Sequence, residues 1–592
     1  MHGNNQNNRW FFAVAITVIS AMTLLLTACN AGEKGQLSDT DTTSASVPAD
    51  TVTVSETVTE PQTQTVLIEN GASDYIVISP RAVSSEMTAV MRDFIAKLEK
   101  KSGVKLKLYP EAYTETECEI VVGFVRAREQ SVARMNEIGY TSWGVIREGK
   151  KFIVTAYDEE GVKMALNTLM AHIEEKDGKW VVTGDLDLTG TVKKHGSHNI
   201  PVCLSKNAAV GGIYHCGEES LEVCLRAVTG EEYDAYGKTL TDAGWVKYTD
   251  NRMANNLFAT YTHAADGKTI HLGYYPTLRN GTLRIISEPT GYLPATEAAA
   301  YTRVTETTFT QIGRKAVDIN SAPGMSYIMQ LADGSFIIID GGPANADDEA
   351  ALFEYLKSLT PAGQKPTVAA WFITHAHSDH MALANRFLVN YHTQIDVKMA
   401  AYNFPNYEAV VDAKDVAGVA SKYTPMIEQF QKNISQYWPD AEHFVIHAGQ
   451  KLYLADAEIE ILFTHEDLFP GEFTWVNHTS LAFRITAGGK NVMILGDCEK
   501  SLCQQMSDTF STYLKSDMLQ LTHHGANGAC IDLYRNIDPA ICFWACSQSK
   551  YESDERMLGV KAGYDFNAYL RDTTIRVREH YHSGTTTVIP MS

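Results

Sequence analysis

Three histidines and one aspartate lie within six residues of each other, in the segment Thr374-His375-Ala376-His377-Ser378-Asp379-His380. The apolar run at 368–373 precedes them and predicts a buried strand. Neutral imidazole and carboxylate are ligands that Zn²⁺ and similar cations prefer. We expect His375 and His377 to converge on one cation from the strand end. Asp379 and His380 should reach a second cation where the chain turns into the next helix.

The pattern His-x-His-x-Asp-His after a strand resembles the signature of the metallo-β-lactamase superfamily. The resemblance implies that Asp340, in an Asp-Gly-Gly segment after a strand, orients the metal-binding loop from behind the ligands. It also implies that the Asp497 carboxylate bridges two metals. In the late His-His-Gly segment, the histidine before glycine fits the family best, so His524 is the expected ligand and His523 a proton donor or a support for the ligands.

The Asn-x-x-Ser-Leu segment at 477–481, with the late His-His-Gly, looks most like the ComEC-type branch, which includes the extracellular hydrolase domain of a DNA-uptake channel. Two features depart from the family pattern. Met381-Ala382 stands where the family usually has Gly-Gly. His478 lies where a third ligand of the first metal is usual, but its spacing is short and the branch often lacks this histidine. His478 is therefore either a ligand or a surface histidine, and without it a single metal or a metal other than zinc becomes an alternative.

The expected ligands predict hydrolysis by two divalent cations, zinc with manganese as the alternative. Two such cations about 3.5–4 Å apart hold a water between them and lower its pKa towards about 7. The resulting hydroxide attacks phosphorus or carbonyl carbon, and the cations neutralise the developing oxyanion. We expect Asp379 to hold the attacking water as well, and His523 to donate a proton.

The branch resemblance favours a phosphodiester or related phosphoryl bond as substrate. The alternatives are hydrolysis of a lactam, lactone or thioester, or a surface lipoprotein that binds a glycan or peptide and carries a vestigial metal site. The complete set of candidate ligands argues against a vestigial site.

The elements that must position these residues alternate between strands and helices. Apolar runs predict strands in this part of the chain, and a helix is expected at 347–359. The strands are expected at 316–319, 326–331, 335–340, 368–373, 492–495 and 518–521. The resemblance implies an αββα sandwich over 309–592, with the metals at one edge between two sheets.

Two accessory domains are expected before the sandwich, so the chain as a whole is a multidomain α/β and α+β protein. Residues 66–195 predict a small α/β domain, with helical spacing of apolar residues at 87–98 and 162–173. The segment 140–169 resembles the small N-terminal domain that precedes the barrel of β-N-acetylhexosaminidases. No such barrel follows, so the resemblance implies a structural or glycan-facing module.

Residues 196–308 predict an α+β unit with the element order β-α-β-β-β. Its helix is expected at 231–243, and tyrosines are frequent in the unit. The strands are expected at 221–227, 257–261, 269–275 and 282–286.

The N-terminus predicts export and a lipid anchor. Arg9 precedes an apolar run at 10–26, and small residues stand before Cys29, which resembles a bacterial lipobox. We expect residues 1–28 to be a signal peptide and Cys29 to be lipidated, which places the protein outside the cytoplasm on the bacterial cell membrane. Residues 29–65 are rich in Ser and Thr and predict a disordered linker.

Charge and composition exclude several classes of protein. The 592 residues contain 50 Lys and Arg against 71 Asp and Glu, a net charge of −21. A protein that coats nucleic acid would be basic, so no stable nucleic-acid complex is expected. The expected partners are the membrane through the anchor, an unidentified substrate and a surface glycan. Ten cysteines are too few for a disulfide scaffold.

Overall fold

The computed structural model describes residues 64–592 apart from short gaps, namely 82, 84, 193–197, 199, 206–207, 217–218, 315–323, 406–412, 469–475 and 527. The expected signal peptide, lipidated Cys29 and nearly all of the linker lie outside the described residues, as does the strand expected at 316–319. Among the described residues, no helix combines the length and the apolar character that crossing a bilayer requires.

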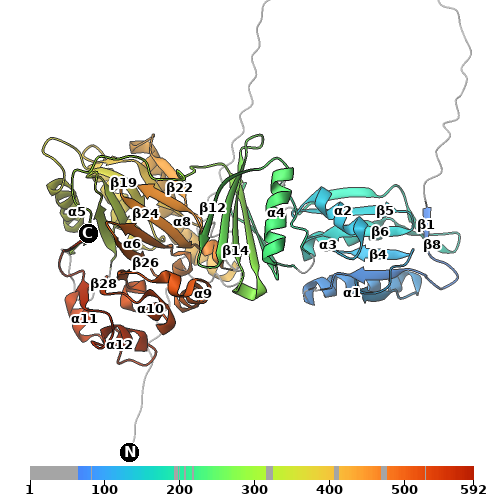
Figure 1. The fold of residues 1–592 in the computed structure, drawn as a ribbon. Coiled ribbons are helices and arrows are strands. Elements are labelled where there is room, and N and C mark those ends of the chain that lie inside the picture. The colour runs from blue at the N-terminus through green and yellow to red at the C-terminus, as the bar shows by residue number, and fades with distance from the viewer. Residues whose placement is uncertain are drawn as a thin grey trace, which may run out of the picture. The chain divides into compact units, whose positions relative to one another are not determined.

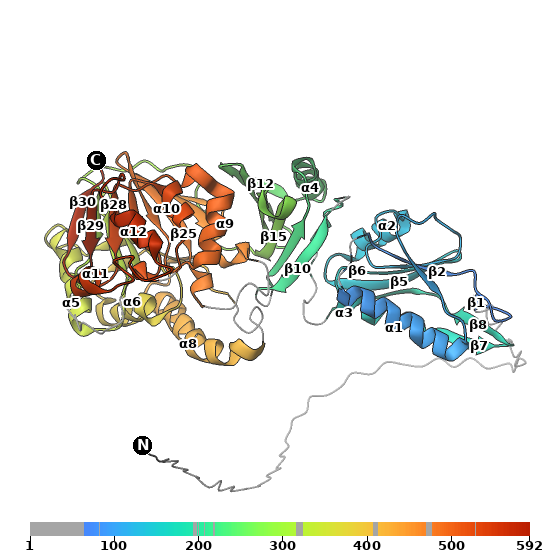
Figure 2. The ribbon, with the colours of Figure 1, turned by 90° about the horizontal axis from the view of Figure 1, so that it is seen from below.

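The first part of the described chain is a six-stranded mixed sheet covered by helices on both faces. Figure 2 shows α1 and α3 on one face and α2 on the other. The sheet has the order β3-β2-β4-β6-β5-β9, with strands β2 (Ile76–Ser79), β3 (Lys107–Pro110), β4 (Glu119–Val122), β5 (Ser142–Glu148), β6 (Lys151–Ala156) and β9 (Asp187–Thr191). The helices are α1 (Ser85–Ser102), α2 (Glu129–Ile138) and α3 (Glu159–Ala171). A small sheet, β1 (Gln64–Ile68), β8 (Lys179–Thr183) and β7 (Ile173–Lys176), adjoins them.

The middle part is one six-stranded antiparallel sheet with α4 (Gly230–Asp242) on one face (Figure 1). Its order is β10-β11-β15-β14-β13-β12, with strands β10 (Ala209–His215), β11 (Leu221–Arg226), β12 (Val246–Met253), β13 (Asn256–His263), β14 (Lys268–Tyr275) and β15 (Thr282–Pro289). The expected order β-α-β-β-β was wrong because β10 and β12 were not foreseen. Strand β12 is mostly exposed, so its sequence lacks the apolar alternation of a half-buried strand.

The C-terminal part is the αββα sandwich that the sequence predicts. One sheet has the order β22-β21-β19-β18-β17-β16-β30, with β20 beside β19, and the other has the order β23-β24-β25-β26-β27-β28-β29. The first sheet consists of β16 (Thr308–Gln311), β17 (Ser326–Gln330), β18 (Phe336–Asp340), β19 (Thr367–Phe372), β20 (Asp396–Val397), β21 (Met399–Tyr402), β22 (Glu442–Val445) and β30 (Thr587–Pro590). The second consists of β23 (Lys451–Leu454), β24 (Ala457–Phe463), β25 (Ala482–Ala487), β26 (Lys490–Ile494), β27 (Met518–Gln520), β28 (Ile541–Trp544) and β29 (Glu579–His582).

Helices cover the outer faces of this sandwich (Figure 2). They are α5 (Ala346–Ser358), α6 (Ser378–Tyr391), α8 (Ala413–Tyr437), α9 (Lys500–Phe510), α10 (Ile531–Ile537), α11 (Gln548–Ser553) and α12 (Asp565–Arg571). Strand β18 shows why the layers form. Ile337 and Ile339 are buried between the two sheets, whereas Phe336 and Ile338 are buried on the helical side.

Four strands of this sandwich end at the same edge. Strands β18 and β19 are parallel neighbours in one sheet, and β26 and β27 are parallel neighbours in the other. The carboxyl ends of parallel strands lie at one edge of a sheet. Asp340 is the last residue of β18, and the segments after the other three strands carry His375, Asp497 and His524, so the topology brings together residues far apart in the sequence.

Candidate metal centre

Two groups of three side chains lie at this edge with their ligand atoms close together. In each group the three atoms lie within 4.8 Å of one another. The first group is His375, His377 and Asp497, and the second is Asp379, His380 and His524. The structure therefore divides the His-x-His-x-Asp-His segment into two pairs, as the spacing predicts, and adds one distant residue to each pair.

In the first group, the two histidines face each other through ring nitrogens. His375 Nε2 lies 2.9 Å from His377 Nδ1 and 3.8 Å from Asp497 Oδ2. His375 is fully buried at the end of β19, and His377 is the residue before α6. Both rings can therefore offer a lone pair to one cation.

In the second group, His524 Nε2 lies 3.2 Å from Asp379 Oδ2 and 3.3 Å from His380 Nε2. Asp497 reaches this group as well. Its Oδ1 lies 3.2 Å from His380 Nε2 and its Oδ2 lies 3.4 Å from His524 Nε2. One carboxylate thus contacts both groups, which is the geometry that a bridging ligand requires.

Asp340 fixes the orientation of the ligands from behind. Its carboxylate accepts hydrogen bonds from the Thr374 backbone N–H and the Thr374 hydroxyl, each at 2.7 Å, and pairs with His380 Nδ1 at 2.7 Å. His380 is thereby held with Nε2 directed at Asp497, the arrangement typical of a metal-binding histidine. Asp340 itself has a φ of 55°, a left-handed conformation uncommon for a residue other than glycine.

The late histidine pair is held in a strained turn. His523 and His524 both have left-handed backbone, with φ of 49° and 58°. The turn directs His524 inward, where its side chain is 2% exposed, whereas the His523 side chain remains 23% exposed at the rim. His523 Nε2 lies 4.0 Å from Asp497 Oδ2 and 3.4 Å from Asn477 Nδ2. Of the two histidines, His524 is therefore placed as the ligand and His523 beside the centre.

His478 lies in neither group. Its Nε2 is 3.7 Å from Glu499 Oε2, and Asn477 donates a hydrogen bond of 3.1 Å to the same carboxylate. Among the groups around Glu499, His478 contributes most to lowering the pKa of this carboxyl, and Asn477 acts in the same direction. Glu499 was not predicted from the sequence, although its position two residues after the candidate ligand Asp497 indicates that it lies near the metal centre. Whether His478 binds metal stays a prediction.

Burial and charge set the protonation of the histidines. Burial lowers the pKa of His375 and lowers that of His377 to about 4, so both rings are neutral. Burial also acts against a charge on His380, but the carboxylates of Asp497 and Asp340 outweigh it and raise its pKa. The pKa of His524 is raised to about 9 because Asp497 and Asp379 outweigh burial in the same way.

These residues fit a pair of divalent cations. Asp497 Oδ1 is buried and forms no hydrogen bond of acceptable geometry among the residues that the structure describes, although His380 Nε2 lies 3.2 Å away. Two carboxylates among four imidazoles, with nitrogen atoms facing each other, form a donor set of the kind that Zn²⁺ accepts. A cation would replace the protons that otherwise keep His380 and His524 charged.

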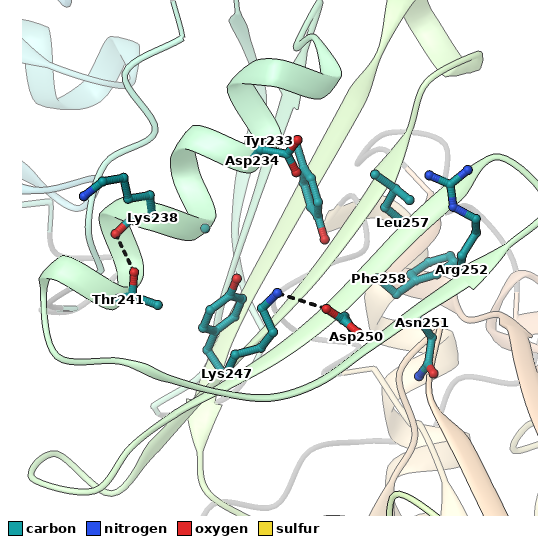
Figure 3. Close-up of a pocket in the computed structure, with 12 residues that line it drawn as sticks. Tyr233, Asp234, Lys238, Thr241, Lys247, Asp250, Asn251, Arg252, Leu257 and Phe258 are labelled. Carbon is teal, nitrogen blue, oxygen red and sulfur yellow. Dashed lines mark hydrogen bonds and ion pairs between the residues drawn. The ribbon is translucent and has the colours of Figure 1, made fainter.

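The middle sheet carries a separate hollow of about 580 Å³ (Figure 3). It lies between α4 and the strands β12 and β13, and Tyr233 and Tyr261 help to line it. Lys247 and Asp250, which face each other in Figure 3, are paired at 2.9 Å. The lining contains none of the candidate ligands, so the hollow is not part of the metal centre.

The comparison with sequence models of known families agrees with this geometry. Residues 321–545 match the sequence model of the family described as Metallo-beta-lactamase superfamily. No curated protein matches the chain in sequence. Among solved structures, the chain is 12% identical to CmlA, a diiron β-hydroxylase from Streptomyces venezuelae, with a TM-score of 0.29 over 51% of this chain and 55% of that one. It therefore spans about half the length of the hydroxylase.

A second solved structure is the short form of human tRNase Z. It is 14% identical, with a TM-score of 0.26 over 48% of this chain and 99% of that one. At identities and TM-scores of this size, the likenesses support no conclusion about substrate.

Proposed function

Residues 321–545 form a domain of the metallo-β-lactamase superfamily, a superfamily of metal-dependent hydrolases, and on this premise we propose that the protein hydrolyses a phosphodiester or related phosphoryl bond at the bacterial cell surface. The observation that carries the proposal is the position of Asp497. Its carboxylate contacts His380 and His524 in one group and lies 3.8 Å from His375 in the other.

The chain's own residues have distinct roles in this proposal. His375, His377 and Asp497 would hold one cation, and Asp379, His380 and His524 the other, with Asp497 shared. When bound, two divalent cations activate water and neutralise charge that develops on oxygen. Asp340 keeps His380 aimed at the centre, and the Asp379 side chain is 20% exposed, so solvent can reach the proposed centre at this residue.

A phosphoryl substrate is supported by the groups at the rim. Hydrolysis of a phosphodiester expels an alkoxide, which leaves faster when an acid protonates it. His523 is partly exposed, lies 4.0 Å from Asp497 and is contacted by the Asn477 amide. Asn477 belongs to the segment that resembles the ComEC-type branch, and this resemblance favours phosphoryl over carbonyl chemistry.

The proposal includes a location and partners. Lipidation of Cys29 would anchor the protein to the membrane outside the cytoplasm, with the segment after it as a spacer. The net charge of −21 disfavours a stable complex with a long nucleic acid, so a small or oligomeric substrate is favoured. The resemblance of residues 140–169 to a hexosaminidase accessory domain supports contact with a surface glycan.

One assay tests the choice of substrate. The full-length chain, purified in detergent and supplied with zinc or manganese, is assayed on bis-p-nitrophenyl phosphate, a chromogenic cephalosporin and a lactone. The proposal expects turnover of the phosphodiester and none of the other two. His443→Gln is a matched control, because His443 bonds Tyr402 and Ser435 and belongs to neither ligand group. Turnover of the cephalosporin or the lactone without turnover of the phosphodiester would contradict the proposal. So would a metal-loaded chain that hydrolyses none of the three substrates.

A further inference from the structure

The face of the middle sheet that points away from α4 is unusually polar for a buried surface. Residues alternate along β11, β14 and β15, so Val223, Leu272 and Ile285 are packed in one core cluster. The intervening residues carry Glu222, His271, Arg284 and Glu288, and of these Glu222, His271 and Arg284 are buried. A buried polar face requires partners from the elements that cover it.

Two segments of the metallo-β-lactamase part cover this face. They are residues 447–450 and the one-turn helix η2 (His465–Asp467). Arg284 pairs with the Asp467 carboxylate, and Asn251 donates a 2.9 Å hydrogen bond to the Gly449 carbonyl. Gly449 has a φ of 92°, and a Cβ there would lie 2.0 Å from Phe258 Cγ. The covering segments therefore contact the sheet closely.

Within this contact, two histidines converge on one carboxylate. Glu288 Oε1 lies 3.4 Å from His271 Nε2 and 3.0 Å from His447 Nε2. The imidazole rings are stacked with centroids 4.1 Å apart. The three ligand atoms lie within 4.8 Å of one another, and the two histidines are 4% and 1% exposed.

Each histidine is also held at its far nitrogen. His447 Nδ1 lies 3.0 Å from Glu466 Oε2, and His271 Nδ1 lies 3.2 Å from Thr260 Oγ1. A histidine that binds metal through Nε2 usually has Nδ1 fixed by a carboxylate or another polar group. Both histidines of this group have that arrangement, and three ligands of the type His, His and Glu occur in known zinc sites.

Charge balance favours a cation at the same point. Glu288 and Glu466 flank His447, each with a carboxylate oxygen 3.0 Å from one of its ring nitrogens. With neutral histidines, these two carboxylates carry two negative charges into a buried contact, which costs free energy unless they are compensated. One divalent cation supplies the missing charge.

We propose that His271, Glu288 and His447 bind a zinc ion separate from the hydrolytic centre, and that this ion fastens the middle sheet to the metallo-β-lactamase part. His271 and Glu288 come from β14 and β15, whereas His447 comes from the segment after β22. The ion therefore joins His447 to residues at least 159 positions earlier in the sequence, and its role is structural.

The rival arrangement is an ion-pair network without metal. In it, a proton on His447 takes the place of the cation, and the carboxylates of Glu466 and Glu288 outweigh burial to raise the His447 pKa to about 10. The two arrangements use the same side chains, so metal analysis distinguishes them.

The experiment measures zinc per chain in the full-length protein after gel filtration in excess zinc. His271→Gln and Glu288→Gln should each lose about one zinc ion relative to wild type. His263→Gln is the control, because His263 lies on the same sheet but pairs with Asp266 at 2.9 Å. Since the result is a difference between variants, it does not depend on whether the hydrolytic centre binds metal or turns over a substrate.

A second measurement uses the Asp497→Ala/His524→Ala chain, in which the hydrolytic ligands are disrupted. X-ray absorption should show its remaining zinc with nitrogen and oxygen ligands, including imidazole, and adding zinc should raise its Tm. A natively folded double variant that retains no zinc would overturn the proposal. So would zinc contents in His271→Gln and Glu288→Gln equal to that of the His263→Gln control. Either result would leave the ion-pair network as the account of this cluster.

Discussion

The adjacent residues His523 and His524 have opposite environments despite their identical chemistry. His524 is buried with Nε2 3.2 Å from Asp379, whereas His523 lies at the rim beside Asn477. The difference comes from the left-handed turn that carries both residues. The environment therefore supports our proposal that His524 binds metal and His523 transfers a proton.

This assignment predicts different losses in two alanine variants. His524→Ala should lose metal and reduce turnover by more than about 100-fold, since loss of groups that merely support ligands already costs about 10–100-fold. His523→Ala should keep its metal and lose about 10²–10⁴-fold in rate, as expected for a general acid. Metal content and kcat are measured on the same samples. Loss of metal in His523→Ala with retention in His524→Ala would reverse the assignment.

At the scale of single residues, two kinds of candidate ligand could be predicted from the sequence. Some lie together in one segment, and the others occupy positions that match a family pattern. His375, His377, Asp379 and His380 form one contiguous segment, so their chemistry could be inferred from spacing alone. Glu499 and the cluster around Glu288 could not be inferred in this way. Their neighbours in space come from distant segments, and no local spacing indicates which segments meet.

At the scale of single elements, the turn after β27 depends on Gly525. Gly525 has a φ of 81°, and a Cβ there would lie 2.6 Å from Trp544 Cε3. Gly525→Ala should therefore lower stability by about 2–5 kcal/mol, the sum of backbone strain and overpacking. It should also displace His524 and lower metal content. Tm and metal per chain provide the measurements.

Gly563→Ala separates the two contributions. Gly563 has a φ of 85°, but nothing lies within 4 Å of its added Cβ. The Gly563→Ala substitution should lower stability only through backbone strain, by about 1–2 kcal/mol, and leave the metal content per chain unchanged. Equal effects of both substitutions would show that contact with Trp544 does not matter.

Acid sensitivity in the N-terminal six-stranded sheet is expected from Glu119, at the start of β4. Burial alone would raise its pKa, but Arg128 at 2.8 Å and the Thr116 N–H at 2.9 Å outweigh it and lower the pKa. A carboxyl group whose pKa is lowered in the folded state contributes its full stabilisation at pH values above its unfolded-state pKa of about 4.3. This contribution is lost as the pH falls towards and through the folded-state pKa.

Glu119→Gln should therefore destabilise this part of the chain by about 3 kcal/mol at pH 7, because it leaves Arg128 buried without its charge partner. The difference from wild type should shrink as the pH falls below about 4. Calorimetry as a function of pH measures both effects. Glu117→Gln, which alters an exposed pair with Lys150, should change little at any pH. A difference in Glu119→Gln that is independent of pH would contradict this account.

Individual helices and strands could be predicted where apolar residues recur at a regular spacing. The expected helix at 347–359 and the observed α5 at Ala346–Ser358 differ by one residue at each end. Strand β10 was missed because Gly211 and Gly212 interrupt its pattern. The two-sheet architecture of the sandwich was inferred through a resemblance, and the order of its strands was not predicted, since the strand sequences do not encode which strands become neighbours.

For the whole molecule, the metallo-β-lactamase superfamily inferred from the metal motif is confirmed over residues 321–545, and the αββα architecture with it. The attachment of the molecule to a membrane is a separate proposal. Cys29→Ser should leave an uncleaved precursor or release the protein from the membrane, because two or three acyl chains are needed for lasting attachment. Mass spectrometry of the wild-type N-terminus checks this, and an unmodified mature terminus would exclude the anchor.

The central claim is that one carboxylate organises two metals for hydrolysis. Its most direct test is the metal content and bis-p-nitrophenyl phosphate turnover of full-length wild-type protein and Asp497→Ala. Because Asp497 contacts both ligand groups, we predict that the variant loses about two metal ions per chain and at least about 100-fold in turnover. An Asp497→Ala chain with wild-type metal content and wild-type turnover would contradict the claim.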